Sequence, residues 1–342
     1  MNSNWKAPED WLKIETIEAH TAGEPLRIYI DGLPEIKGQT ILEKRKYFKE
    51  NFDFIRTGTI FEPRGHADMY GAIITEAERK DSDFGTFFLH NEGYSTMCGH
   101  AIIALTKIAF QTGFIKKNIK NPLIQIDTPA GQVTAFAKIT NNKVTSVSFQ
   151  NVPSFVYKKD LQIEVEDIGS VKFDIAFGGA FYAFVNADEI NLDLSENNHN
   201  KIIEYGKKIK NAVMKNIEIK HPFEKDLSFL YGTIFISKAK NPKNHSRNVC
   251  IFAEGELDRS PTGTGISARA AIHFSRNEIK IDQSITIESI LGTCFDVKVV
   301  KETKFGGFNA IIPEVSGNAY ITGKNTFYFD PEDPLIKGFI FR

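Results

Sequence analysis

Two short segments of the chain carry residues whose types and spacing could do chemistry. In the first, Cys98 is followed directly by Gly99 and His100. An Ala- and Ile-rich helix is predicted over Met97–Phe110, so Cys98 falls on its opening turn. The positive end of the helix dipole and the unpaired amides of that turn lower the pKa of a thiol. Cys98 is therefore a candidate base or nucleophile.

The simpler alternative for Cys98 is a small buried hydrophobic residue without a chemical role. Gly93 and Gly99 favour the chemical interpretation, because bare backbone beside a thiol lets a ligand approach closely. The other two cysteines, Cys250 and Cys294, lie within apolar strand patterns. For these two we keep the interpretation as small buried residues.

The second segment is Asp258–Gly265, at the start of another predicted helix, Pro261–Phe274. Proline suits the first turn of a helix, and the glycines expose amides that can hold a carboxylate. A phosphate-binding loop is the alternative, but the segment lacks the lysine and the spacing of such a loop. Asp258 either caps the turn or holds a substrate amine, and the local sequence leaves both open.

The two helical segments align with each other without gaps. The paired positions are Cys98 with Thr262, Gly99 with Gly263 and His100 with Thr264. After a shift of register, the match continues into the strands that follow. A chance likeness between two Ala- and Ile-rich helices is the alternative to a duplication. A duplication would direct two helix starts toward one shared cleft, so we expect Cys98 and Thr262 to face it together.

The elements that position these segments read as short strands, rich in β-branched and aromatic residues and separated by Gly and Asn turns. We predict helices at the two segments only. The chain has 342 residues, more than one hydrophobic core usually fills, so two domains are expected.

Composition excludes several classes of protein. The 42 basic and 43 acidic residues give a net charge of −1, which argues against nucleic-acid binding. The Lys-rich stretches 207–210 and 238–243 are interpreted as solvated faces. No apolar run approaches the roughly 20 residues of a membrane span, and the polar N-terminus does not resemble a signal peptide. Three cysteines without a CxxC pair, and histidines without ligand spacing, predict reduced thiols, a cytoplasmic protein and no metal.

Together, Met97–His100 and Asp258–Gly265 resemble the two active-site signatures of the proline racemase family, which includes hydroxyproline epimerases and trans-3-hydroxyproline dehydratases. Further matches to that family lie at 20–27, 62–69, 178–183 and 317–323, so the resemblance covers essentially the whole chain. It implies an α+β fold of two pseudo-symmetric domains, each a curved, mostly antiparallel sheet around a central helix. The domains are expected at 1–152 plus 321–342 and at 153–320, with the active site between them.

The resemblance also implies roles for site residues in a cofactor-independent homodimer. Cys98 is the catalytic base, Asp258 contacts the substrate's ring nitrogen, and the remaining substrate-binding residues are Gly99, His100, Gly263 and Thr264. Racemases of the family use a second cysteine, whose position here is Thr262. A threonine hydroxyl has too high a pKa to exchange the α-proton readily, so racemisation is disfavoured.

The departure at Thr262 is typical of the branch that dehydrates trans-3-hydroxy-L-proline to pyrroline-2-carboxylate. In that substrate the 3-hydroxyl and the α-hydrogen lie on the same ring face, so one cysteine suffices for elimination of water. Two alternatives stay open at this point. One is a proline racemase or 4-hydroxyproline 2-epimerase; the other is a non-catalytic protein that binds imino acids.

Overall fold

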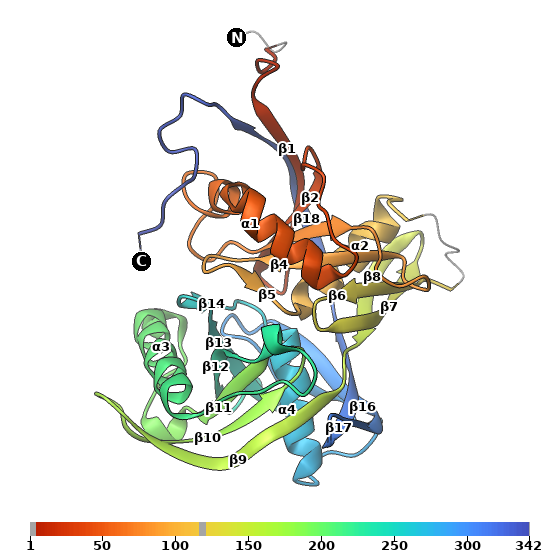
Figure 1. Cartoon of the computed structure of the whole chain (residues 1–342). Coiled ribbons are helices and arrows are strands. Elements are labelled where there is room, and N and C mark those ends of the chain that lie inside the picture. Colours follow the sequence, from red (N-terminus) through yellow and green to blue (C-terminus); the bar gives the residue numbers. More distant parts are fainter. Residues whose placement is uncertain (1–4, 116–120, 342) are drawn as a thin grey trace.

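The computed structural model describes residues 5–115 and 121–341, which fold into two stacked halves (Figure 1). The first half contains β1 (Leu12–Thr21), β2 (Glu24–Asp31), α1 (Ile41–Ile60), β3 (Gly71–Thr75), β4 (Phe84–Leu89), β5 (Tyr94–Ser95), α2 (Gly99–Gln111), β6 (Leu123–Thr128), β7 (Gly131–Thr140), β8 (Lys143–Gln150) and β18 (Ala319–Phe329). The second half contains β9 (Ser154–Val165), β10 (Gly169–Phe177), β11 (Phe181–Asn186), α3 (His199–Asn216), β12 (Leu230–Ser237), β13 (Ser246–Phe252), β14 (Glu256–Leu257), α4 (Gly263–Ser275), β15 (Ile285–Glu288), β16 (Cys294–Phe305) and β17 (Phe308–Gly317).

The two halves repeat one order of strand pairings. In the first, β18, β1 and β2 are antiparallel, β2 pairs parallel with β3, and β4 pairs parallel with β6, which leads into the antiparallel β7 and β8. In the second, β9, β10 and β11 are antiparallel, β11 pairs parallel with β12, and β13 pairs parallel with β15, which leads into β16 and β17. The expected pair of pseudo-symmetric α+β halves is confirmed.

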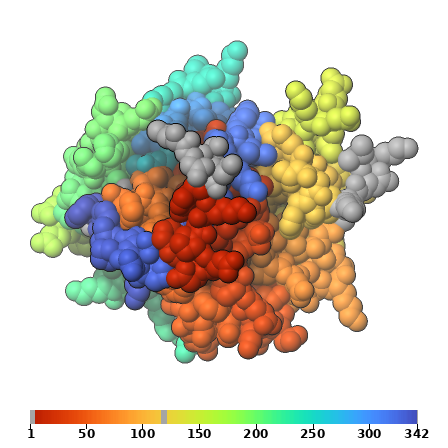
Figure 2. All heavy atoms as spheres, turned by 90° about the horizontal axis from the view of Figure 1, so that it is seen from above, coloured from red at the N-terminus to blue at the C-terminus, as the bar shows by residue number. Residues whose placement is uncertain are grey.

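The chain crosses between the halves twice. It passes from β8 to β9 at residues 151–153, and it returns at Asn318, where β18 starts to pair with β1. Seen from above, C-terminal residues in blue lie against the red N-terminal strand (Figure 2). The division 1–152 plus 321–342 and 153–320 stays a proposal from the sequence, and the pairing of Ala319 with Thr21 lies two residues before its second boundary. Residues 1–4, 116–120 and 342 of the proposed first domain lie outside the described residues.

The two helices predicted from the sequence are both present. Each begins two residues later than expected, so Cys98 and Thr262 are the residues that precede the first turns of α2 and α4. Both helices are mostly apolar and buried over almost their whole length, as expected of helices enclosed by a sheet. Because the two helices are the central elements of the two halves, their N-termini are fixed by the packing of the sheets around them.

The expectation of only two helices was wrong, because α1 and α3 are helical as well. Thr40 and Glu43 form a capping box at the start of α1, and the spacing of these two residues is a helix signal that the strand interpretation overlooked. The aromatic residues of α1, such as Phe48 and Phe52, are more typical of strands. Neither helix meets the length and hydropathy expected of a membrane span, and nor does any other helix in the described part of the chain.

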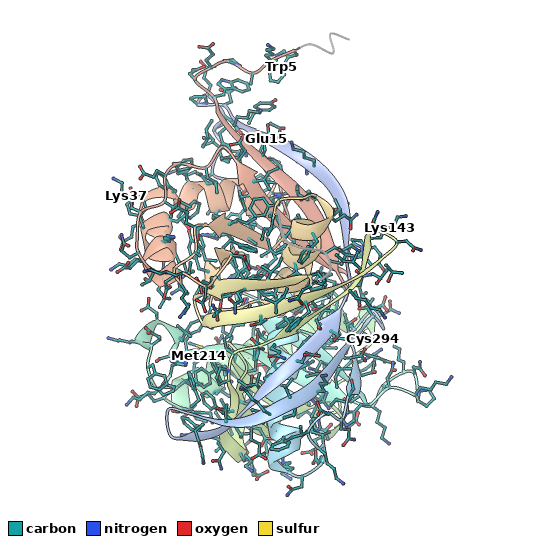
Figure 3. The ribbon with its side chains drawn as sticks, turned by 90° about the vertical axis from the view of Figure 1, so that its right-hand side faces the viewer. Trp5, Glu15, Lys37, Lys143, Met214 and Cys294 are labelled. Atoms are coloured by element: carbon teal, nitrogen blue, oxygen red, sulfur yellow. The ribbon has the colours of Figure 1, made fainter. Side chains whose placement is uncertain are left out.

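Two local interpretations also need correction. Lys210, taken from the sequence as part of a solvated face, is buried on α3, and its ammonium donates to the carbonyl of Ala253 at 2.8 Å. Cys294, taken as a buried strand residue, is exposed at the start of β16 on the second half (Figure 3). In both cases the sequence around the residue did not show whether another element of the fold would cover its side chain.

Phe155 tests the core of the second half. Its ring is fully buried on β9 and stacks on Phe177 of β10 and on Phe308 of β17, with centroids 5.2 and 4.4 Å away. Phe155→Ala should lower the free energy of unfolding by about 3–5 kcal/mol through lost burial and a residual cavity. Urea denaturation measures it, with the exposed Phe341→Ala as control. A loss below about 1 kcal/mol would mean that this aromatic stack does not stabilise the fold.

Candidate active site

The N-termini of α2 and α4 meet backbone to backbone at the junction of the two halves. A Cβ added to Gly99 would lie 2.7 Å from the Cα of Gly263, and one added to Gly263 would lie 2.8 Å from the Cα of Gly99. Both distances are shorter than real Cβ contacts, so only glycine permits the approach. The gapless alignment of the two segments thus corresponds to a direct contact in space, and the unpaired amides of both helices point into one site.

A small cavity of about 20 Å³ lies at this contact. All seven residues that the sequence proposed for the site line it: Cys98, Gly99, His100, Asp258, Thr262, Gly263 and Thr264. The sequence interpretation missed five further lining residues: Tyr70, Met97, Tyr182, Tyr231 and Phe252. The sequence contained indications of two of the three tyrosines. Tyr70 directly follows the family-like segment 62–69, and Tyr182 lies within the family-like segment 178–183.

Cys98 lies beside His100, with 3.1 Å between Sγ and Nδ1. Burial raises the pKa of the Cys98 thiol well above its usual value, although a bond from the Ala101 amide opposes the rise; the charge of Asp258 adds to it. The lowered pKa expected from the helix dipole is therefore wrong for this buried thiol, because loss of water outweighs the dipole. Burial also lowers the pKa of His100 to about 3, so this pair is neutral at pH 7.

Thr262 and Asp258 are joined on the opposite wall. The Thr262 hydroxyl donates to Oδ2 of Asp258 at 2.7 Å, and the amide of Ser260 donates to Oδ1 at 2.7 Å. Asp258 therefore caps its own turn and also faces the cavity, so the two interpretations left open by the sequence are compatible. Burial raises the pKa of Asp258, and the bonds from Thr262 and Ser260 oppose the rise. The Cys250 thiol bonds to Thr262 as well, but it does not line the cavity.

Three tyrosines complete the cavity wall. The Tyr182 hydroxyl lies 2.7 Å from Oγ1 of Thr264, and the Tyr70 hydroxyl donates to Ser95 at 2.6 Å. The Tyr70 hydroxyl also bonds to the thiol of Cys98 and lies 3.4 Å from the hydroxyl of Tyr231. Burial is the main reason that the pKa of each of these tyrosines is well above its usual value, so all three are neutral hydroxyls at physiological pH.

Polar bonds between the halves close the site. Oε2 of Glu24 accepts from the Arg259 amide at 2.7 Å, and the Arg259 guanidinium pairs with Asp68 at 2.7 Å. The Thr96 hydroxyl donates to the carbonyl of Gly179 at 2.6 Å. A cavity of this size holds about one water molecule. A ring-containing ligand therefore requires that the halves move apart before it can enter.

The described residues bring together no group of three or more His, Cys, Asp or Glu side chains suited to a metal ion. The groups that the cavity does offer are amides of two helix starts, one carboxylate, one thiol beside an imidazole, and hydroxyls. Such a set can hold a carboxylate and a cationic amine and can move a proton at the carbon between them.

Comparison with known proteins shows the family of this chain. A sequence model of the family described as "Proline racemase" matches residues 16–340. The chain belongs to the proline racemase family. It is 54% identical over 334 residues to a protein of Colwellia psychrerythraea named trans-3-hydroxy-L-proline dehydratase, covering 98% of this chain and 94% of that one. It is also 41% identical to a protein of Acetoanaerobium sticklandii named proline racemase, covering 95% and 98%.

Solved structures share the fold to different degrees. A hydroxyproline epimerase from Agrobacterium vitis, solved with bound trans-4-OH-L-proline, superposes with a TM-score of 0.90 at 28% identity over 96% of both chains. A PhzF-family protein of Bacillus anthracis superposes with a TM-score of 0.61 at 13% identity, covering 92% of this chain and 99% of that one. At that identity the second likeness concerns the fold alone.

Gly263→Val tests whether the contact between the helix starts forms the anion site. The valine side chain would force Gly99 away and separate the two sets of amides. Affinity for pyrrole-2-carboxylate, a flat carboxylate probe, should fall about 10- to 100-fold, the value of one charge-assisted hydrogen bond. Calorimetry on the folded variant measures it. Gly323→Val is the matched control, since a Cβ there meets nothing within 4 Å; equal affinity in both variants would exclude this contact from the binding site.

The state of the Cys98 thiol can be measured directly. Because burial raises its pKa, the ligand-free protein should show no Cys98 thiolate below about pH 8.5, the ordinary thiol pKa. A pH titration of thiolate ultraviolet absorbance in wild type, minus the same titration of Cys98→Ser, isolates this group. A difference signal already present at pH 7 would show that the helix dipole, and not burial, controls the thiol.

Proposed function

We propose that this member of the proline racemase family is a trans-3-hydroxy-L-proline dehydratase, which removes water from its substrate to give pyrroline-2-carboxylate. The observation that carries the proposal is Thr262, an alcohol in the position paired with Cys98. Family membership alone does not separate racemases from dehydratases, because relatives with both names match this chain. The residue opposite Cys98 does separate them, since inversion at carbon needs a second proton donor on the second ring face.

Substrate binding follows from the charges around the cavity. The carboxylate is held by the amides of the two helix starts, at Gly99, His100, Gly263 and Thr264. The cationic ring nitrogen pairs with Asp258, whose negative charge otherwise helps to raise the thiol's pKa. Neutralising that charge favours the thiolate. Water that enters while the halves are apart also favours the thiolate form of Cys98.

Elimination then proceeds on one face of the ring. Once ligand charge and admitted water have reversed the effect of burial on both pKa values, Nδ1 of His100, 3.1 Å from the sulfur, accepts the thiol proton, and the Cys98 thiolate takes the α-proton of the bound substrate. The electron pair of the broken C–H bond forms the double bond between C2 and C3. The C3–O bond breaks, and the hydroxyl leaves as water after it receives a proton on the same face. The enamine of pyrroline-2-carboxylate remains, and no cofactor is required.

The two alternatives make different demands. A racemase or epimerase needs an acidic group that touches the second ring face. The residue on that side is Thr262, whose hydroxyl hydrogen is donated to Asp258. Cys250 carries a thiol, but it lies behind Thr262 and outside the cavity wall. A non-catalytic binding protein has no use for a thiol beside an imidazole. The expected homodimer and cytoplasmic location remain predictions from the resemblance and the composition.

Incubation with trans-3-hydroxy-L-proline tests the function. Wild type should form pyrroline-2-carboxylate, detected by mass spectrometry, and Cys98→Ser should lose at least about 100-fold in rate, the lower range for general-base catalysis. Chiral analysis of L-proline and 4-hydroxyproline in parallel should show little inversion. Rapid inversion without dehydration would establish the racemase or epimerase. Tight binding of the hydroxyproline without any turnover would establish the binding protein.

Thr262→Cys should place a second proton donor opposite Cys98. We expect a gain in exchange of the α-hydrogen of L-proline with deuterated water, followed by NMR. The new thiol would lie next to Cys250, so Cys250→Ala is added to prevent a disulfide between them. The gain can be small, because misplacement by about 1 Å costs about 100-fold in rate. Cys250→Ala alone is the control, and exchange equally fast in it would show that position 262 does not decide the reaction.

A further inference from the structure

Tyr70 lies in the cavity wall, bonds to the proposed base and has no role in the steps above. It directly precedes β3 and is 2% exposed. Its hydroxyl bonds to the Cys98 thiol and to Ser95, and its ring meets the His100 imidazole edge-on, with centroids 4.9 Å apart. The phenol oxygen is therefore held beside the sulfur by contacts on several sides.

This placement matters because of the stereochemistry of the proposed substrate. Cys98 must face the ring side that carries the α-hydrogen, and in trans-3-hydroxy-L-proline the 3-hydroxyl is on that same side, one carbon away. A hydroxyl bonded to the sulfur is consequently within reach of the leaving oxygen. Hydroxide is a poor leaving group, so its departure is accelerated by a proton donor. In a concerted elimination Cys98 cannot supply that proton, because it is removing the α-proton at the same moment.

We propose that Tyr70 is the general acid that protonates the departing 3-hydroxyl. The step rests on the dehydratase function proposed above. The Cys98 thiolate takes the α-proton and becomes a thiol, and the C–H electron pair forms the C2–C3 double bond. The C3–O bond breaks as the oxygen takes the phenol proton of Tyr70 and leaves as water. The tyrosinate then takes the proton from the Cys98 thiol, which restores both groups for the next turnover.

Other hydrogen-bond donors of the wall are less well placed. His100 faces the sulfur with the nitrogen that accepts its proton, and Tyr182 is paired with Thr264. Tyr231 reaches the sulfur side only through Tyr70. Burial raises the pKa of the Tyr70 phenol, so it keeps its proton at physiological pH, as an acid in this step must. Ser95 can turn its own hydroxyl toward Tyr70 and so release the phenol hydrogen toward the cavity.

The test compares two leaving groups in Tyr70→Phe. With trans-3-hydroxy-L-proline, kcat should fall about 100- to 1000-fold, within the range for loss of a general acid. With trans-3-fluoro-L-proline the leaving group is fluoride, which departs without a proton. Fluoride release should fall less than about tenfold, the share of one lost hydrogen bond to the sulfur. Tyr29→Phe is the matched control, since Tyr29 is an equally buried tyrosine that bonds to Thr59 outside the cavity.

Two results would overturn the role of Tyr70: dehydration by Tyr70→Phe at nearly the wild-type rate, or equal losses with both substrates, which indicate a structural role only. Fluoride release also reports that the variant is folded. Should it not fold, Tyr70→Met provides a second non-acidic side chain that adapts to irregular gaps, and its dehydration should again fall more than its fluoride release; parallel losses would contradict the proposal. Failure of the dehydratase function is distinguishable, because wild type itself would then form no pyrroline product.

Discussion

The contact between Gly99 and Gly263 is the constraint on which the rest of the site depends. Two helices can bring their unpaired amides to one point only where neither backbone carries a Cβ. The repeated sheets hold α2 and α4 in the middle of their halves, and the residues just before the helices, Cys98 and Thr262, are thereby placed on the walls of one cavity. The geometry of the cavity is a consequence of packing two copies of one supersecondary unit head to head.

The same closeness has an electrostatic consequence. Exclusion of water raises the pKa of the Cys98 thiol and of Asp258, and it lowers that of His100, so the thiol and the imidazole are both uncharged at physiological pH. These two groups become charged when a zwitterionic ligand supplies partners for them. Bonds between the halves, such as that from the Arg259 amide to Glu24, keep water out until the halves separate. Opening, binding and ionisation are therefore coupled in this account.

Much of this arrangement was predictable from the sequence, and the remainder has identifiable reasons. The gapless match of two glycine-containing helix starts predicted α2, α4 and a shared site, because local periodicity and helix-start residues depend on few neighbours. The direction of the Cys98 pKa could not be predicted, since it is decided by burial under distant elements. Tyr70 and Tyr231 come from different halves of the chain, and only the fold brings their hydroxyls within 3.4 Å. Helix α1 was not predicted because its aromatic residues are more typical of strands, although its capping box was present in the sequence.

The central claim is that all proton transfers take place on one ring face, the face of Cys98. The most direct measurement compares trans-3-hydroxy-L-proline with cis-3-hydroxy-L-proline, which differ only in the face that carries the 3-hydroxyl. In the cis isomer the hydroxyl lies opposite the α-hydrogen, toward Thr262. The account predicts that the trans isomer yields pyrroline-2-carboxylate while the cis isomer, at equal concentration, yields at least about 100-fold less per unit time. Equal rates for the two isomers would contradict it.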